Sequence, residues 1–306
     1  MNTSTARQTS ERTALREMLR TMSKLFKFRV VLLLVWAAMG GAFLGAHGRP
    51  TLKDLALLVI TGTLAAAGSS AINQYLEQDV DARMRRTQRR PLPAGLIEHP
   101  HVILGIALAM ILIAVFMVLP SNPTMSLYLA LGALIYVGVY TIWLKPRSVL
   151  NIVIGGAAGS CAVMTGGAAV GAASDPGVIA LALLLFTWSP THFWALALYY
   201  KEDYARGNFP MLPVHASPSK SAWWIFVHAM GTGTAAILLA LHPSLGWIYL
   251  IPAGAATGLL IYHSAALITN PTSKRAIRLF ITSNFFLLLI LLAIMLVSTG
   301  RQFFAS

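Results

Sequence analysis

Three oxygen-bearing side chains recur at four-residue intervals near the end of a long apolar segment: Asn73, Glu77 and Asp81. A helix turns about 100° per residue, so these side chains fall within about 80° of one another and form one stripe. Pro91 and Pro93 would stop any helix soon afterwards. Between the stripe and the prolines lies a dense group of cations, Arg83, Arg85, Arg86, Arg89 and Arg90. Carboxylates that face such a group favour a metal-bridged polyphosphate as the ligand.

A second polar cluster, THFWALALYYKEDYARGNFPMLPV, has the same layout as the first. In each cluster an apolar helix ends in an acid, and a basic residue and two prolines follow: Asp81, Arg86, Pro91 and Pro93 in one, and Asp203, Arg206, Pro210 and Pro213 in the other. The two helices are four spans apart and run in the same direction, which is typical of a parallel internal repeat. Such a repeat would make both clusters face each other above one central cavity.

Two further groups allow more than one interpretation. His192 shares a helix face with Tyr199 and Asp203. It is either a hydrogen-bonded packing residue or, because ionisable groups inside membranes are often functional, a residue that binds or orients a polar substrate. Lys145 and Arg147 lie just before a helix of small residues, and they are either ordinary cytoplasmic anchors or phosphate ligands.

The elements that position these residues must be membrane-spanning helices. Of the 306 residues, 57% are hydrophobic and only 11% are charged, which excludes an ordinary soluble domain. Runs of about 20 apolar residues, each long enough to cross a hydrocarbon core about 30 Å thick, recur along the chain. We predict an all-α polytopic protein, two four-helix halves plus a ninth helix, with spans at 28–46, 55–78, 101–119, 126–144, 149–171, 178–200, 221–241, 245–266 and 276–298.

Most of the predicted spans carry no chemistry of their own. The third and fourth are expected to be plain apolar helices. Small residues spaced four apart let helices approach closely in lipid, and they predict a tightly packed bundle. These pairs are Gly41 and Gly45, Gly155 and Gly159, Gly167 and Gly171, and Gly254 and Gly258. Cys161, the single cysteine, excludes a disulfide within the chain and is expected to be a packing residue.

The basic residues predict the orientation of the chain. Of the 23 Lys and Arg residues, all but Arg49, Lys53 and Arg301 lie in or beside the segments of one side. Since cytoplasmic segments carry the excess of Lys and Arg, the N-terminus is expected in the cytoplasm and the C-terminus outside. The net charge of +13 is therefore mostly a topology signal, and the lipid bilayer, not a nucleic acid, is the expected partner.

Residues 1–27 form a basic tail before the first span. The tail is expected either to contact an anionic leaflet as an amphipathic helix or to be disordered. Its Arg, Ser and Thr content also resembles a transit peptide, although Glu11 and Glu17 count against that interpretation.

The acids alone would repel a highly charged diphosphate, and a magnesium ion between them would remove this repulsion. It favours an octahedral shell of one or two carboxylates, phosphate oxygens and water. Its protein ligands could come from Asn73, Glu77 and Asp81 on one helix and from Asp203 on another. Arginines would hold the phosphate oxygens by bidentate hydrogen bonds. A C–O bond to an allylic carbon could then ionise and leave a carbocation in the apolar bundle.

The motif N-x-x-x-E-x-x-x-D with RRPLPAG, together with LNIVIGGAAG and the second polar cluster, resembles the UbiA-type intramembrane prenyltransferase superfamily, and in particular its haem-farnesylating branch. The likeness runs from about residue 25 onward and implies one prenyltransferase domain over residues 28–300. It also implies Mg²⁺-dependent transfer of farnesyl from farnesyl diphosphate to a vinyl group of haem B. Water would complete the product, haem O, and a large cavity would open toward the cytoplasm and the lipid.

The resemblance assigns roles to individual residues. The expected catalytic and metal-binding residues are Asn73, Glu77, Asp81 and Asp203. The expected diphosphate-binding residues are Arg83, Arg86, Lys145 and Lys201. His192 would contact haem, either at the iron or at a propionate. The chain departs from the superfamily in two places, since Glu77 stands where Asp is usual and only Glu202 and Asp203 remain of the second Asp-rich motif.

The resemblance also implies a cellular setting. The short N-terminal tail favours a bacterial plasma membrane over a mitochondrial inner membrane, and haem A synthase or terminal oxidase assembly would be possible partners. Two other functions stay open. One is prenyl transfer to a quinone precursor or another aromatic acceptor. The other is a transporter or lipid carrier, which would place charges deep inside the spans, whereas these acids lie at helix ends.

Overall fold

The computed structural model describes residues 16–305, with only the backbone of residues 301–305. Much of the predicted basic tail, residues 1–15, lies outside the described residues. Within them, nine helices are long and apolar enough to cross a membrane, as the sequence predicts. They are Phe28–Gly45 (α2), Leu52–Asp81 (α3), Pro100–Val118 (α4), Pro123–Ala133 with Leu134–Leu144 (α5 and η1), Asn151–Gly155 with Ala157–Ala169 (α6 and α7), Pro176–Tyr199 (α8), Pro218–Leu238 with Leu239–Leu241 (α11 and η2), Gly246–Thr269 (α12) and Ser273–Ala305 (α13).

Three of these spans begin with the same local signal, a polar capping residue followed directly by a proline. The caps are Asn122 before α5, Asp175 before α8 and Ser217 before α11, and each side chain accepts a hydrogen bond from a backbone N–H of the first turn. Those N–H groups have no partner within the helix, and proline has no N–H to satisfy, so the pair starts a helix at little cost.

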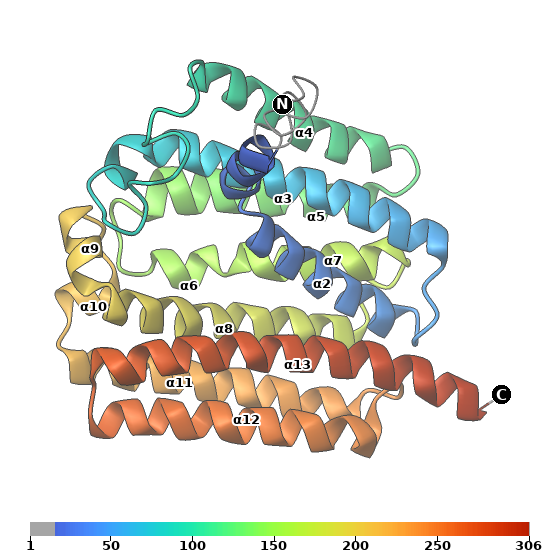
Figure 1. The fold of residues 1–306 in the computed structure, drawn as a ribbon. Helices are drawn as coiled ribbons and strands as arrows, with labels where there is room; N and C mark the ends of the chain where they lie inside the picture. Colours follow the sequence, from blue (N-terminus) through green and yellow to red (C-terminus); the bar gives the residue numbers. More distant parts are fainter. Residues whose placement is uncertain (1–15, 306) are drawn as a thin grey trace, which may run out of the picture.

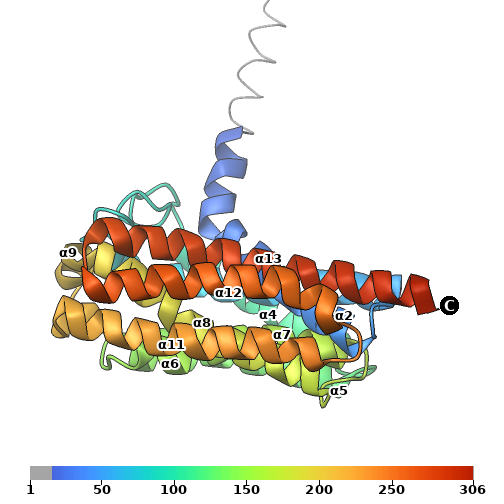
Figure 2. The same ribbon diagram turned by 90° about the horizontal axis from the view of Figure 1, so that it is seen from below.

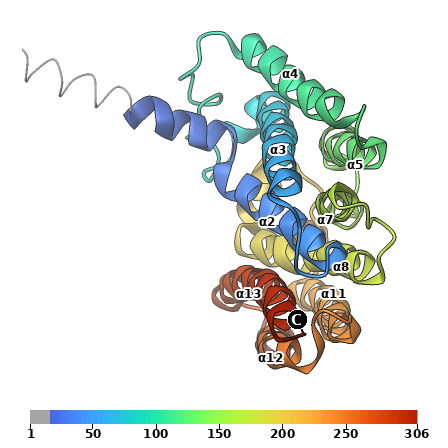
Figure 3. The ribbon, with the colours of Figure 1, turned by 90° about the vertical axis from the view of Figure 1, so that its right-hand side faces the viewer.

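The spans lie side by side, and the connections gather at the two ends of the bundle (Figure 1). Helix α2 lies in the middle and contacts α3, α7, α8 and α13 (Figure 3). Helix α3 packs on α4 as α8 packs on α11, and these pairs are four spans apart. This packing order agrees with the predicted internal repeat and leaves α13 as the additional span, against α8 and α12.

Helices α2 and α7 approach each other closely at glycines. A Cβ on Gly166 would lie 1.7 Å from the carbonyl oxygen of Ala38, and a Cβ on Gly41 would lie 2.3 Å from that of Val163. The predicted packing role of Gly41 is therefore confirmed. For Gly171, Gly254 and Gly258 the prediction is wrong, since a Cβ on any of them would meet no atom of a neighbouring part of the described chain within 4 Å.

One end of the bundle carries most of the polar structure and is called the polar end here. The loop of residues 82–99 and the short helices Lys201–Arg206 (α9) and Leu212–His215 (α10) lie together at this end (Figure 1). Residues 16–25 form a further helix, which leaves the bundle across the direction of the spans (Figure 2). Both polar clusters predicted from the sequence therefore lie at the same end.

Candidate active site

The predicted acidic stripe is an inward-facing surface of α3. Asn73, Glu77 and Asp81 are only 1%, 5% and 1% exposed, whereas Asp79 on the same helix is exposed. The four-residue spacing thus places three oxygen-bearing side chains on one buried face at the polar end. These three residues are called the acid face below.

Each side chain of the acid face meets a cation from a different segment. Lys145 Nζ lies 2.5 Å from Glu77 Oε1, and Arg90 Nη1 lies 2.5 Å from Asp81 Oδ2. Asn73 Oδ1 accepts a hydrogen bond from the ammonium of Lys27. Because burying a carboxylate is costly unless it is paired, these cations are what allow the acid face to exist inside the bundle.

One oxygen of the acid face has no such partner. Asp81 Oδ1 is buried and accepts no hydrogen bond, whereas nearly all buried polar atoms in folded proteins are paired. A carboxylate oxygen in this condition suits a bound cation. Among the described residues, no three Asp, Glu, His or Cys side chains converge as a ready-made metal site. Mg²⁺ needs no such set, because it commonly takes one or two carboxylates and completes its shell with phosphate oxygens and water.

The fourth span contributes directly to the site, so its description as a plain apolar helix is wrong. Its last part, η1, is a π-helix, a form that is rare and often found at functional sites. The hydroxyl oxygen of Thr141 accepts a 3.0 Å hydrogen bond from Asn73 Nδ2, and the Tyr136 hydroxyl accepts one of 3.2 Å from Lys27. Lys145 follows η1 directly and also lies over the ring of Tyr140.

The second cluster meets the first through Asp203 of α9. Its carboxylate accepts hydrogen bonds from the backbone amides of Arg85 and Arg86 at 3.3 and 3.0 Å, and it pairs with Arg206. Burial would raise the pKa of Asp203, but the hydrogen bonds from Arg206, Arg86 and Arg85 outweigh it and hold the pKa below its ordinary value. Asp203 is therefore ionised near neutral pH and joins α9 to the loop that follows the acid face.

The four residues predicted to bind diphosphate are not equally placed. Lys145 pairs directly with Glu77 of the acid face. Arg86 is held beside α9, where its guanidinium lies 5.7 and 5.6 Å from the ring centroids of Tyr200 and Tyr204. Arg83 is exposed on the loop after α3, and Lys201 is half-buried at the start of α9.

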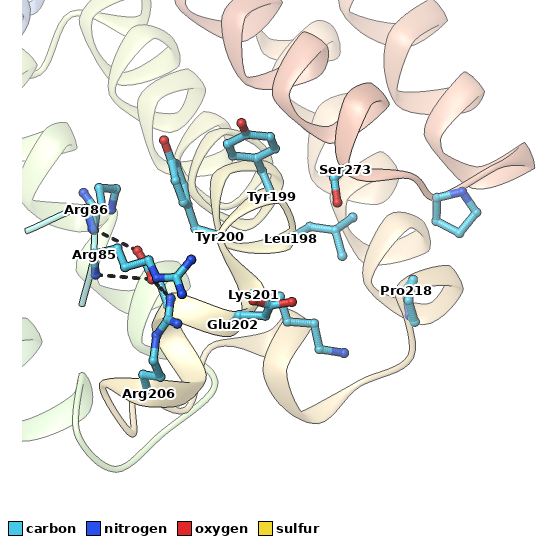
Figure 4. A pocket seen from close by; sticks show the side chains of 12 residues that line it. Arg85, Arg86, Leu198, Tyr199, Tyr200, Lys201, Glu202, Arg206, Pro218 and Ser273 are labelled. Carbon is cyan, nitrogen blue, oxygen red and sulfur yellow. Dashed lines mark hydrogen bonds and ion pairs between the residues drawn. The ribbon is translucent and has the colours of Figure 1, made fainter. Parts of the chain in front are cut away.

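A cavity of about 740 Å³ opens beside α9 (Figure 4). Its wall contains cations, acids, two tyrosines and a few apolar residues: Arg85, Arg86, Leu198, Tyr199, Tyr200, Lys201, Glu202, Asp203, Arg206, Pro218, Pro271 and Ser273. The cavity is thus adjacent to Asp203 and not to the acid face. The central cavity expected from the sequence stays a prediction.

His192 lies between α8 and α13, away from the residues of the acid face described above. Its Nδ1 atom is 2.8 Å from the hydroxyl oxygen of Ser283, and its ring stacks on Trp188 with centroids 4.3 Å apart. Phe280 lies against it as well, with centroids 4.4 Å apart. These contacts support the packing interpretation, and a haem contact by His192 stays a prediction.

Several residues of the site were not singled out from the sequence. Lys27 was counted among the basic residues of the tail, and Arg90 was one of five arginines in a loop. Tyr136, Tyr140 and Thr141 lie in a span with no acidic residue to draw attention to it. Tyr136 and Tyr140 are four residues apart, as are Thr141 and Lys145, so each pair would share a helix face, and this spacing is the one available signal.

The match to a family model defines the class of this chain, the membrane-embedded prenyltransferases. Residues 34–295 match the model of the UbiA prenyltransferase family. The chain is 44% identical over 275 residues to a protoheme IX farnesyltransferase of Metallosphaera sedula, covering 90% of this chain and 94% of the relative. It is 39% identical over 285 residues to one of Saccharolobus islandicus, covering 93% and 99%. The chain therefore belongs to the UbiA prenyltransferase family, among the members named protoheme IX farnesyltransferase.

Solved structures show the same fold. A digeranylgeranylglyceryl phosphate synthase matches with a TM-score of 0.77 at 18% identity, over 93% of this chain and 99% of that one. A UbiA homolog from Archaeoglobus fulgidus, bound to GPP and Mg²⁺, matches with a TM-score of 0.60 at 17% identity, over 90% and 99%. The protein is thus an integral membrane prenyltransferase with nine candidate spans in its described part.

Proposed function

We propose that this chain transfers the farnesyl group of farnesyl diphosphate to a vinyl group of haem B and acts as a haem O synthase. The observation that carries the proposal is the acid face, where Asp81 keeps an unpartnered oxygen among buried cations at the polar end of an apolar bundle. The relatives, which are named for farnesyl transfer to protoheme IX, support this choice of donor and acceptor.

The oxygen donors of the acid face fit Mg²⁺. Asn73, Glu77 and Asp81 would hold the ion, with Asp203 from the second cluster as a further ligand. When bound, Mg²⁺ would neutralise the diphosphate oxygens and make diphosphate a better leaving group. The A. fulgidus homolog bound to Mg²⁺ and GPP supports the same ion here.

The cations of the site would bind the leaving group. Lys145, Arg90 and Lys27 already face the acid face and can turn toward diphosphate oxygens. Arg86 and Arg83 would add hydrogen bonds from the loop. The rings of Tyr136 and Tyr140, stacked with centroids 5.7 Å apart, would stabilise positive charge on the allylic carbon.

The bond changes balance with one water molecule. The C–O bond of farnesyl diphosphate breaks, and the allylic carbon forms a bond to the terminal carbon of the haem vinyl group. Water adds to the neighbouring vinyl carbon and loses a proton. The products are haem O, diphosphate and that proton. The apolar spans would exclude other water from the allylic cation until the new carbon–carbon bond has formed.

The chain would work at the inner leaflet of a bacterial plasma membrane, as one catalytic domain over residues 28–300. Residues 1–27 would be the cytoplasmic tail, and haem A synthase or an oxidase assembly would receive the product. The excess of Lys and Arg on the polar side supports this orientation.

The test is product analysis with purified protein in lipid. Farnesyl diphosphate, haem B and Mg²⁺ should give haem O, identified by mass spectrometry, and removal of Mg²⁺ with EDTA should stop its formation. A parallel reaction offers a hydroxybenzoate as the acceptor. Prenylation of the hydroxybenzoate in place of haem B would overturn the proposed acceptor. If neither acceptor is prenylated, the proposal that this chain transfers farnesyl is wrong.

A further inference from the structure

The cavity beside α9 borders Asp203, and none of the three residues of the acid face lines it. We propose that it receives the two propionate groups of haem B, which Lys201 and Arg85 hold at the mouth of the protein. This inference rests on the proposed function, because it takes haem B as the acceptor. Lys201 would then bind the acceptor, although the family resemblance implies that it binds diphosphate.

The charge of the cavity wall fits a dianion. Four cationic residues line it, against the two acids Glu202 and Asp203, so the wall carries a formal excess of two positive charges. Asp203 pairs with Arg206, and the two charges cancel, so Arg85, Arg86 and Lys201 remain against Glu202. Two carboxylates at one edge of a molecule would match the excess, and bound anions of this kind gain charge-assisted hydrogen bonds.

The cations also have a suitable arrangement. Figure 4 shows Arg85 and Arg86 on one side of the cavity, while Lys201 extends toward Pro218 on the other. Arg86 is engaged by the rings of Tyr200 and Tyr204, and Arg206 pairs with Asp203. Arg85 and Lys201 are therefore the cations best placed to take one propionate each.

The rest of the wall suits a porphyrin. Leu198, Tyr199, Pro218 and Pro271 give it apolar and aromatic surface. A volume of about 740 Å³ is in the range of about 300–1,000 Å³ that is common for small-molecule sites.

The orientation of haem B then follows from its polarity. Its propionate edge is charged and prefers the aqueous end of the bundle, while its vinyl edge is apolar and prefers the spans. The wall includes Asp203 and none of the three residues of the acid face, whose own cations are Lys145, Arg90 and Lys27. Lys201 and Arg85 would thus serve the acceptor, while Lys145, Arg90 and Lys27 serve the diphosphate.

The test compares haem B with a derivative whose propionates carry no charge. Haem B and its dimethyl ester, whose propionates carry no charge, are titrated into the full chain in detergent, and binding is measured from the change in Soret absorption without farnesyl diphosphate. The variants are Lys201→Gln and the double variant Lys201→Gln with Arg85→Gln. The control is Lys220→Gln, an exposed lysine at the same end outside the cavity wall.

Each lost cation should weaken haem B binding at least about tenfold, since a charge-assisted hydrogen bond to the propionate is lost with it. Binding of the dimethyl ester should stay the same in all variants, and Lys220→Gln should bind both ligands like the wild type. Thermal unfolding of each variant reports on folding.

Three results with the variants would overturn the inference: unchanged haem B affinity in the double variant, equal weakening of both ligands, or weaker farnesyl diphosphate binding in Lys201→Gln with normal haem B binding. The last result would return Lys201 to the diphosphate. A wild-type protein that binds haem B and its ester equally contradicts only the propionate site. Failure of the wild type to bind haem B at all contradicts the proposed function as well.

Discussion

At the scale of single residues, cations of the chain itself neutralise the carboxylates of the acid face. Glu77, Asp81 and Asn73 are met by Lys145, Arg90 and Lys27, which come from three different segments of the chain. Removing one member of a buried pair leaves the other unpaired and costs about 3–5 kcal/mol. Conservative substitutions that keep the shape of the side chain are therefore the sharpest probes of this site.

Asp81→Asn keeps the size of the side chain and removes its charge. Because a neutral amide holds Mg²⁺ more weakly than the carboxylate that it replaces, we expect haem O formation to fall at least about a hundredfold while the protein still accumulates in the membrane. The matched control is Asp79→Asn, which makes the same change on the exposed side of α3 and should stay active. Near-normal turnover of Asp81→Asn would contradict the metal assignment.

Thr141 is a positioning residue for Asn73. Its hydroxyl oxygen accepts a hydrogen bond from Asn73 Nδ2, which keeps Oδ1 directed toward Lys27. Thr141→Val removes the acceptor, so we expect the Mg²⁺ concentration for half-maximal activity to rise about tenfold. Thr141→Ser should restore the wild-type value. A fall in activity with the Mg²⁺ dependence unchanged would show that Thr141 acts in another way.

At the scale of elements, the sequence revealed what is periodic and local. The spans are visible as apolar runs, and the acid face is visible because Asn73, Glu77 and Asp81 recur every four residues on one helix. The partners of these residues were not visible. Lys27 and Arg90 reach the site from segments that no periodicity connects to α3, and no pattern in residues 134–144 predicted the π-helix η1. Pairings of this kind need the three-dimensional arrangement.

The contact between α2 and α7 is the tightest place to test the packing of elements. A Cβ on Gly166 would lie 1.7 Å from a backbone oxygen of α2, which cannot move like a side chain. We expect Gly166→Ala to destabilise the protein by about 1–3 kcal/mol, measured by thermal unfolding in detergent. Gly254→Ala adds the same methyl group in open space, so it should leave stability unchanged or raise it by about 0.5–1 kcal/mol. Equal effects of both substitutions would contradict the packing described for α2 and α7.

At the scale of the whole molecule, the two halves bring their polar clusters to one end. The helices α3 and α8 run in the same direction, so the loop after α3 and the helix α9 after α8 meet there, where Asp203 accepts hydrogen bonds from Arg85 and Arg86. Had the clusters lain at opposite ends, no single site could use both. The proposed reaction further requires that this end face the cytoplasm, where farnesyl diphosphate is made available.

The orientation can be tested with single cysteines, because the natural Cys161 is buried and can be replaced by Ala. In that background, Gln88→Cys places a thiol in the exposed loop at the polar end, and Lys53→Cys places one at the opposite end. A charged maleimide cannot cross the bilayer, so in intact cells it should label Lys53→Cys and not Gln88→Cys. In inverted membrane vesicles the pattern should reverse, since basic loops stay in the cytoplasm. Labelling of Gln88→Cys from outside intact cells would place the acid face at the outer leaflet, and a cytoplasmic supply of farnesyl diphosphate could not reach it.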